Sequence, residues 1–260
     1  MSKDWFTQWK QEENAPFTGW DFSYLRGRYE EEMLPWCYEE KVKAFLKPQV
    51  KLLDMDTGGG EFLLSLQHPY SLTAVTESYP PNVEHCQKWL APLGIQVVKA
   101  DSGGILPFAE NQFDVVINRH GAYQIEEIKR VLKPNGFFIT QQVGGSNARE
   151  LSSFLCDHFN PQFPRHNLEN ESQRFTQAGF RLMYQNQSYP KIRFFDVGAL
   201  CYYVKRIPWE YPGFSVENAY EKLLRLQDRI EKYGKIEATS HRFIIIAKNQ
   251  KNTKKEHGIE

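Results

Sequence analysis

Short apolar segments alternate with helix-like segments through the middle of the chain. Runs rich in Val, Ile, Leu and Phe predict buried strands, at 50–55, 72–77, 95–101, 113–119 and 137–143. Apolar residues at helical spacing predict helices between them, over 61–67, 82–94 and 123–136. Strands that alternate with helices in this way are typical of a parallel sheet with crossover helices.

The pattern changes on both sides of this region. Residues 1–45 are rich in aromatic and charged side chains, and we expect a helical N-terminal extension there. After Gly145 the alternation loosens, which indicates an insertion over 145–215 that follows the fifth strand. Further helices are expected over 171–180 and 216–234, and a last strand over 241–249. The sequence therefore predicts one α/β domain over 1–250, with a polar, flexible tail at 251–260.

Composition narrows the class of protein. The chain has 260 residues, 41% of them hydrophobic, and equal numbers of basic and acidic residues, 32 each. A zero formal charge argues against a nucleic-acid partner, because such proteins usually carry a basic excess. Neither a signal peptide nor a run of about 18 apolar residues is present, so we expect a cytoplasmic protein without membrane insertion. The four cysteines form no CxxC pair and are expected to be buried thiols, without a metal site.

A glycine turn follows the first of these strands. The stretch LLDMDTGGGEF places Asp54 at the strand end, Asp56 two residues later, and then Gly58, Gly59 and Gly60. Neither the dinucleotide fingerprint nor the P-loop pattern matches here, because the required third glycine or Lys-Ser/Thr pair is missing. Glu61 would also compete with a phosphate for the start of the next helix. The turn therefore indicates a ligand that needs close backbone approach but presents no phosphate.

Acidic residues mark the ends of the next two strands. Glu77 ends the second strand and could accept hydrogen bonds from both hydroxyls of a ribose. Asp101, beside Ser102, follows the third strand and could accept a bond from an exocyclic amine. Together with Asp54 and the glycine turn, these acids predict a nucleoside pocket.

The ensemble of motifs resembles the class I S-adenosylmethionine-dependent methyltransferases, in a type 11-like subgroup rich in small-molecule enzymes. The resemblance covers about 45–145 and includes LLDMDTGGGEF, AVTES, KADSGGILPFAENQFDVVINRH and IKRVLKPNGFFITQQ. It implies a Rossmann-like, doubly wound sheet of seven mostly parallel strands, the last one antiparallel. It also implies the roles of the cofactor-binding residues: Asp54 and Gly58–Gly60 beside the methionine half, Glu77 on the ribose, Asp101 with Ser102 near the adenine amine, and Asn118 near the transferring methyl.

One position departs from the family pattern. Where the pattern D-x-G-x-G has its first glycine, this chain has Asp56. An Asp adopts turn conformations less freely than Gly, and its carboxylate could attract the cofactor's ammonium group or repel its carboxylate. Asp56 is therefore included among the cofactor-binding candidates, and it also favours a second interpretation, that of a weakened site.

Candidates for the chemistry lie in two places. His120, in the loop after the fourth strand, is the candidate base for an acceptor that must lose a proton, although it could instead only order the loop. Arg119 beside it could bind an acidic acceptor. In the N-terminal extension, Trp20, Tyr24 and Arg26 are candidates to line the acceptor pocket under a lid, and 193–209 could cover it from the other side.

We therefore predict an S-adenosylmethionine-dependent methyltransferase that acts on a small-molecule acceptor. Two alternatives stay open: a regulatory or vestigial protein that binds the cofactor without methyl transfer, and a ribosomal-RNA methyltransferase, against which the zero net charge counts.

Overall fold

The computed structural model describes residues 4–17 and 20–251. The chain divides into two compact units. The large unit comprises Trp36–Gln142, Asn167–Gln187 and Phe243–Glu260, and the small unit comprises Met1–Pro35, Val143–His166 and Ser188–Arg242. The predicted single domain with a lid and a cap stays a prediction, and the expected tail lies outside the described residues except for Lys251.

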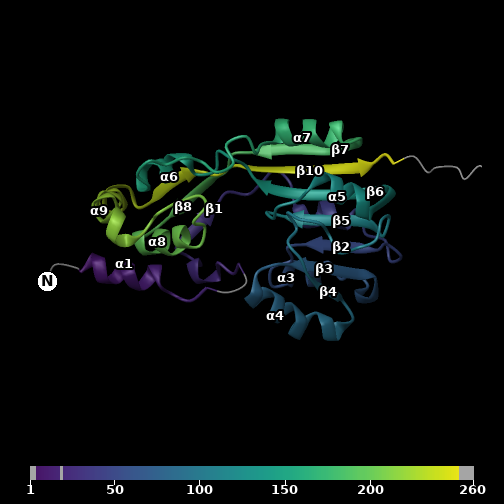
Figure 1. The fold of residues 1–260 in the computed structure, drawn as a ribbon. Coiled ribbons are helices and arrows are strands. Elements are labelled where there is room, and N and C mark those ends of the chain that lie inside the picture. Colours follow the sequence, from purple (N-terminus) through teal and green to yellow (C-terminus); the bar gives the residue numbers. More distant parts are fainter. Residues whose placement is uncertain (1–3, 18–19, 252–260) are drawn as a thin grey trace, which may run out of the picture. The chain divides into compact units, whose positions relative to one another are not determined.

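The large unit is built on a seven-stranded sheet in the order β4-β3-β2-β5-β6-β10-β7 (Figure 1). Its strands are β2 (Leu52–Met55), β3 (Thr73–Glu77), β4 (Gln96–Lys99), β5 (Phe113–Arg119), β6 (Leu132–Val143), β7 (Phe180–Ser188) and β10 (Arg242–Asn249). Its helices are α2 (Tyr38–Lys43), α3 (Glu61–Ser65), α4 (Pro80–Trp89), α5 (Ile125–Val131) and α7 (Leu168–Gln177), with 3-10 turns η2 (Tyr70–Leu72) and η3 (Ala91–Leu93).

The sheet has the predicted mixed topology. From β4 to β6 all neighbouring strands are parallel, and the last strand, β10, runs opposite to β7 (Figure 1). Every residue of β2 and β3 is buried, as expected of central strands covered on both faces. Their side chains join a core with those of β5, α5 and α7, including Leu53, Val116, Ile128 and Phe175. The predicted Rossmann-like fold is confirmed.

The helix predicted over 123–136 is about half as long in the structure. The prediction ran to Gly136, but α5 ends at Val131, and Leu132 already belongs to β6. The cap residue Leu132 has extended backbone angles, and Asn135 adopts a left-handed conformation. The Lys133–Pro134–Asn135–Gly136 segment is thus the entry to the strand, because Pro disfavours helical geometry in the residue before it.

The small unit contains a sheet that the sequence pattern did not predict. Three antiparallel strands pair in the order β1-β8-β9: β1 (Tyr29–Glu31), β8 (Lys191–Phe194) and β9 (Ile236–Thr239). Its helices are α1 (Trp5–Glu13), α6 (Arg149–Leu155), α8 (Val197–Lys205) and α9 (Val216–Tyr233), with the turn η1 (Ser23–Leu25). The segment 193–209 therefore begins as a strand, and the helix starts after its N-cap, Asp196, which accepts a hydrogen bond from the Ala199 amide.

Two smaller expectations can also be compared with the structure. Cys86, Cys156 and Cys201 are buried, but Cys37 is exposed, so the expectation of buried thiols was wrong for Cys37. Within 4–17 and 20–251, no helix has the length and apolar character needed to cross a bilayer.

Candidate functional site

The candidate site lies at the carboxyl edge of the parallel strands in the large unit. Asp54 is in register with Val75 of β3 and Ile117 of β5, and the next residue, Met55, is in register with Asn118. The turn after β2 and the ends of β3 and β5 therefore meet at one edge, where open α/β sheets bind their ligands.

The turn after β2 has the backbone that glycine favours. Gly58 and Gly60 have φ angles of 65° and 86°. Asp56 has φ of 56°, so it occupies the left-handed region that glycine would occupy at the same place in the family pattern. Asp is one of the few residues that enter this region at low cost. The departure at Asp56 is thus compatible with this turn geometry.

Glu77 joins the end of β3 to this turn. Its Oε2 accepts a hydrogen bond from the Gly58 amide at 2.9 Å, and its Oε1 accepts bonds from the amides of Ser78 and Tyr79, each at 2.9 Å. The side chain is buried, with 4% of its surface exposed. The carboxylate therefore orders two loops as well as presenting its oxygens at the edge of the sheet.

Asp54 and Asp56 form an acidic pair beneath the turn. The Thr57 hydroxyl donates to Oδ2 of Asp54 at 2.7 Å, and the Ser102 hydroxyl donates to Oδ1 of Asp56 at 2.9 Å. Burial raises the pKa of Asp54 to about 7, with smaller increases from the carboxylates of Asp56 and Glu77. Burial also raises the pKa of Asp56 to about 6, again with an increase from Glu77.

Asn118 is fully buried at the end of β5. Its amide nitrogen donates to the Met55 carbonyl at 3.4 Å, and its Oδ1 accepts from Gln142 at 2.7 Å and from Thr140 at 3.3 Å. These bonds fix the amide between the ends of β2, β5 and β6.

Asp101, Arg119 and His120 are exposed near the same edge. Oδ1 of Asp101 accepts from the Gly103 amide at 2.9 Å, which orders the loop that also carries Ser102. The guanidinium of Arg119 lies 5.6 Å from the centre of the Phe62 ring and 5.9 Å from that of Tyr38.

The ring of His120 has a defined neighbour. The Trp36 indole donates to Oε1 of Gln141 at 2.8 Å, and this fixes the orientation of the Gln141 amide. The amide nitrogen of Gln141 then lies 3.2 Å from Nε2 of His120, which accepts its hydrogen bond only when Nε2 carries no proton. This contact suits the tautomer in which Nε2 accepts the hydrogen bond from Gln141.

The structure brings together most, but not all, of the predicted site residues. Asp56 contacts Ser102, Glu77 contacts Gly58, and Asn118 reaches the strand that carries Asp54. Trp20, Tyr24 and Arg26 belong to the small unit, so their predicted role in acceptor binding stays a prediction.

Sequence reasoning missed several supporting residues. Thr57 and Thr76 provide hydroxyls beside the acids, with Thr76 Oγ1 3.0 Å from Ser102 Oγ, and Gln142 holds Asn118. A Cβ on Gly121 would lie 2.3 Å from Oδ2 of Asp56, so this position requires glycine. The hydroxyl residues next to acids and the Gln pair within the fifth predicted strand were visible in the sequence, but the contact of Gly121 depends on the fold.

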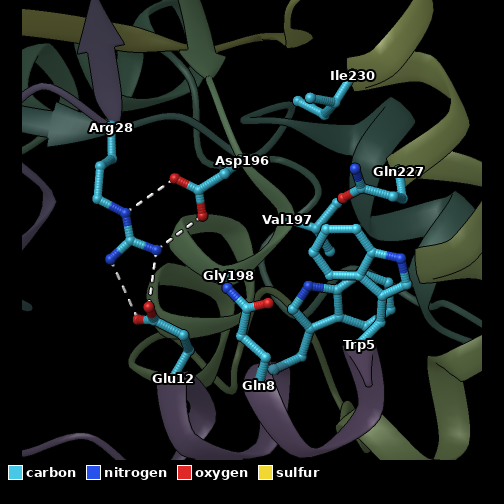
Figure 2. A pocket seen from close by; sticks show the side chains of 10 residues that line it. Trp5, Gln8, Glu12, Arg28, Asp196, Val197, Gly198, Gln227 and Ile230 are labelled. Carbon is cyan, nitrogen blue, oxygen red and sulfur yellow. Dashed lines mark hydrogen bonds and ion pairs between the residues drawn. The ribbon is translucent and has the colours of Figure 1, made fainter. Parts of the chain in front are cut away.

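A hollow in the small unit is lined by residues of α1, α8 and α9 (Figure 2). In Figure 2 the guanidinium of Arg28 points toward both Asp196 and Glu12, with N–O distances of 2.7 and 2.8 Å. The stacked rings of Trp5 and Trp9, 5.6 Å apart, form part of its wall. Because these charged groups satisfy one another, we base the candidate site on the edge of the large sheet instead.

The acids at that edge are not a metal cluster. Among the residues that the structure describes, no three His, Cys, Asp or Glu side chains gather in a way that could hold a metal ion. The edge combines a glycine turn, buried carboxylates and a buried amide, which are groups that bind hydroxyls, amines and ammonium groups.

Comparison with known proteins agrees with this geometry. Residues 53–140 match the family profile described as a methyltransferase domain. The probable phthiotriol/phenolphthiotriol dimycocerosates methyltransferase 2 of Mycobacterium ulcerans is 34% identical in an 88-residue alignment that covers 31% of this chain and 33% of that protein. The match thus spans about a third of the length of that curated relative.

Solved structures share the fold. A candidate methyltransferase from Bacillus halodurans is 16% identical, with a TM-score of 0.55, over 82% of this chain and 97% of its own. The [4+2]-cyclase SpnF is 17% identical, with a TM-score of 0.52, over 82% of this chain and 80% of its own. At such low identity these structures bear on the fold alone. The family profile over 53–140 and the seven-stranded sheet agree in indicating a methyltransferase domain of Rossmann-like fold.

Proposed function

We propose that this protein binds S-adenosylmethionine at the edge formed by β2, β3, β4 and β5 and transfers its methyl group to a small-molecule acceptor. The observation that carries the proposal is the left-handed backbone at Asp56, Gly58 and Gly60, held beside Glu77 by the hydrogen bond from the Gly58 amide. A turn of this shape allows a ligand to approach the backbone closely.

The residues at this edge are suited to the cofactor. Glu77 would accept bonds from the ribose hydroxyls, and Asp101 with Ser102 would lie toward the adenine. Asp54 and the glycine turn would face the methionine half, and the buried Asn118 would lie near the reacting end. The cofactor supplies a methyl group on a positively charged sulfur, an activated carbon that needs little further activation.

The protein's own contribution is then positioning and the handling of a proton. Buried groups such as Asn118 are fixed by hydrogen bonds, so they orient a ligand without first having to reorganise. Where the acceptor must lose a proton, the imidazole ring of His120 would take it. Arg119 would attract an acidic acceptor, and Trp20, Tyr24 and Arg26 remain proposed acceptor contacts. A cytoplasmic location is part of the same proposal.

A second function is supported by one observation. The carboxylate of Asp56 occupies space between the turn after β2 and Gly121, and it could weaken the site. The protein would then bind the cofactor for a regulatory purpose, without methyl transfer. One protein that shares this fold is named as a cyclase, so the fold is compatible with functions other than methyl transfer.

Thermal unfolding with added ligands tests the proposal. S-adenosylmethionine and its demethylated product, S-adenosylhomocysteine, should raise the melting temperature, while NAD and ATP should not. At ligand concentrations of ~100 times the dissociation constant, the free energy of unfolding rises by about 2.7 kcal/mol. Absence of any shift at millimolar ligand would contradict cofactor binding. Binding without methylated product, in a screen of small acids, amines and phenols with methyl-labelled cofactor, would favour the second function.

A further inference from the structure

The carboxylate of Asp56 lies inside the candidate site and not on its rim. It is partly buried, and its Oδ1 is fixed by the Ser102 hydroxyl from the loop after β4. Its Oδ2 faces Gly121 of the loop after β5, where a Cβ would approach to 2.3 Å. The side chain thus fills part of the space between three loops that a glycine at position 56 would leave open.

The surroundings of Asp56 are acidic. The carboxylates of Asp54, Glu77 and Asp101 lie near it, and Glu77 and Asp101 both raise its pKa. The positive charge of Arg119 lowers the pKa of Asp54. Its guanidinium is exposed, however, and lies over the rings of Phe62 and Tyr38. The edge of the sheet therefore concentrates negative charge in a partly buried place, where charge interactions are stronger than in water.

We propose that Asp56 is a specificity-determining residue that makes the site prefer a positively charged cofactor over the neutral-sulfur product. This inference rests on the proposed function. S-adenosylmethionine and S-adenosylhomocysteine differ by one methyl group and by the positive charge on sulfur. A fixed carboxylate inside the pocket favours the charged sulfonium, whereas it gains nothing from a thioether. Such selectivity would help the product leave and would limit inhibition by it.

The experiment compares the binding of three ligands to three proteins by calorimetry. The ligands are S-adenosylmethionine, S-adenosylhomocysteine and sinefungin, in which a protonated amine replaces the charged sulfur centre. The proteins are wild type, Asp56→Asn and the control Glu84→Gln. The Asn side chain keeps the size and the acceptor for Ser102, and it also tolerates a left-handed backbone. Glu84 is exposed on α4, so its variant measures the effect of losing one negative charge elsewhere.

We expect Asp56→Asn to weaken the binding of S-adenosylmethionine and sinefungin about tenfold, while S-adenosylhomocysteine changes less than threefold. Glu84→Gln should leave all three affinities near those of wild type. An unchanged ratio of affinities in Asp56→Asn, or one that shifts toward S-adenosylmethionine, overturns the inference. If Asp56→Asn does not fold, Asp56→Gly answers the same question, since glycine suits this backbone.

Failure of the inference and failure of the proposed function give different results. If wild type binds none of the three ligands, the proposed function fails. If wild type binds them and the variant keeps their ratio, the function stands and Asp56 has no part in charge selection.

Discussion

The Ser102 hydroxyl donates a hydrogen bond to Oδ1 of Asp56 at 2.9 Å. This bond fastens the loop after β4 to the turn after β2, across the intervening strand β3, whose Thr76 hydroxyl lies 3.0 Å from Ser102. A residue that departs from the family pattern is therefore integrated into the hydrogen bonding of the site.

Asp56 occupies a backbone conformation that glycine adopts freely and alanine does not. With φ of 56°, Asp56→Ala should be less stable than Asp56→Gly by about 1 kcal/mol, since both lose the bond to Ser102 but only alanine carries a Cβ into the left-handed region. Urea unfolding of the two variants measures the difference. Equal stabilities would mean that position 56 does not hold this conformation in solution.

The pKa of Asp56 predicts a pH dependence of stability. Its folded-state value of about 6 is above the ordinary value of 3.8, so the folded protein binds this proton more tightly than the unfolded chain does. The stabilisation by protonation is complete below about pH 4 and is lost as the pH rises through about 6. Asp56→Asn removes this dependence. The free energy of unfolding of the variant, measured relative to that of wild type, should therefore rise by on the order of 1–2 kcal/mol between pH 5 and pH 8.

Unfolding of ligand-free wild type and Asp56→Asn at each pH measures this gain. Ser102→Ala provides the contrast, because it keeps the carboxyl and should keep the dependence. A constant stability difference between wild type and Asp56→Asn across this range would show that the carboxyl titrates normally.

Glu77 is predicted to serve both the fold and the ribose. Glu77→Ala would leave the amides of Gly58, Ser78 and Tyr79 without their carboxylate partner, so loss of binding in that variant would be confounded by disorder of two loops. Glu77→Gln retains one oxygen acceptor. We expect it to fold and to bind S-adenosylmethionine about 10–100-fold more weakly, as charge-assisted bonds to hydroxyls are lost. Calorimetry measures the affinity, and a melting curve of the same variant shows whether the loops stay ordered. An unchanged affinity would mean that another acid binds the ribose hydroxyls.

Six strands of the large sheet were predictable because their signals are local, whereas β7 lies within 145–215, where no strand was predicted. Buried strands such as 113–119 carry their own apolar pattern, and the glycines and acids at the strand ends identify the edge that carries the site. The small sheet was not predictable in this way, because its strands β1, β8 and β9 are short and pair residues that are far apart in the chain, such as Tyr29 with Phe194. The positions of Gly121 and Gln141 relative to Asp56 and His120 likewise depend on loops that come together only in the fold.

The last prediction concerns Gly198 in the small unit. A Cβ at this position would lie 2.9 Å from Cγ of Glu12, 3.0 Å from the guanidinium of Arg28 and 3.1 Å from Oδ1 of Asp196. These contacts are tighter than packed side chains accept, and the Arg28–Asp196 pair also carries the N-cap of α8. Gly198→Ala should therefore destabilise the protein by about 1–3 kcal/mol, although alanine otherwise favours helices. Glu12→Ala removes Cγ, the atom nearest to the added Cβ. The double variant should therefore lose less stability than the sum of the losses in the two single variants. Denaturant unfolding of the four proteins tests this coupling, and strict additivity would show that α1 does not pack against Gly198 in solution.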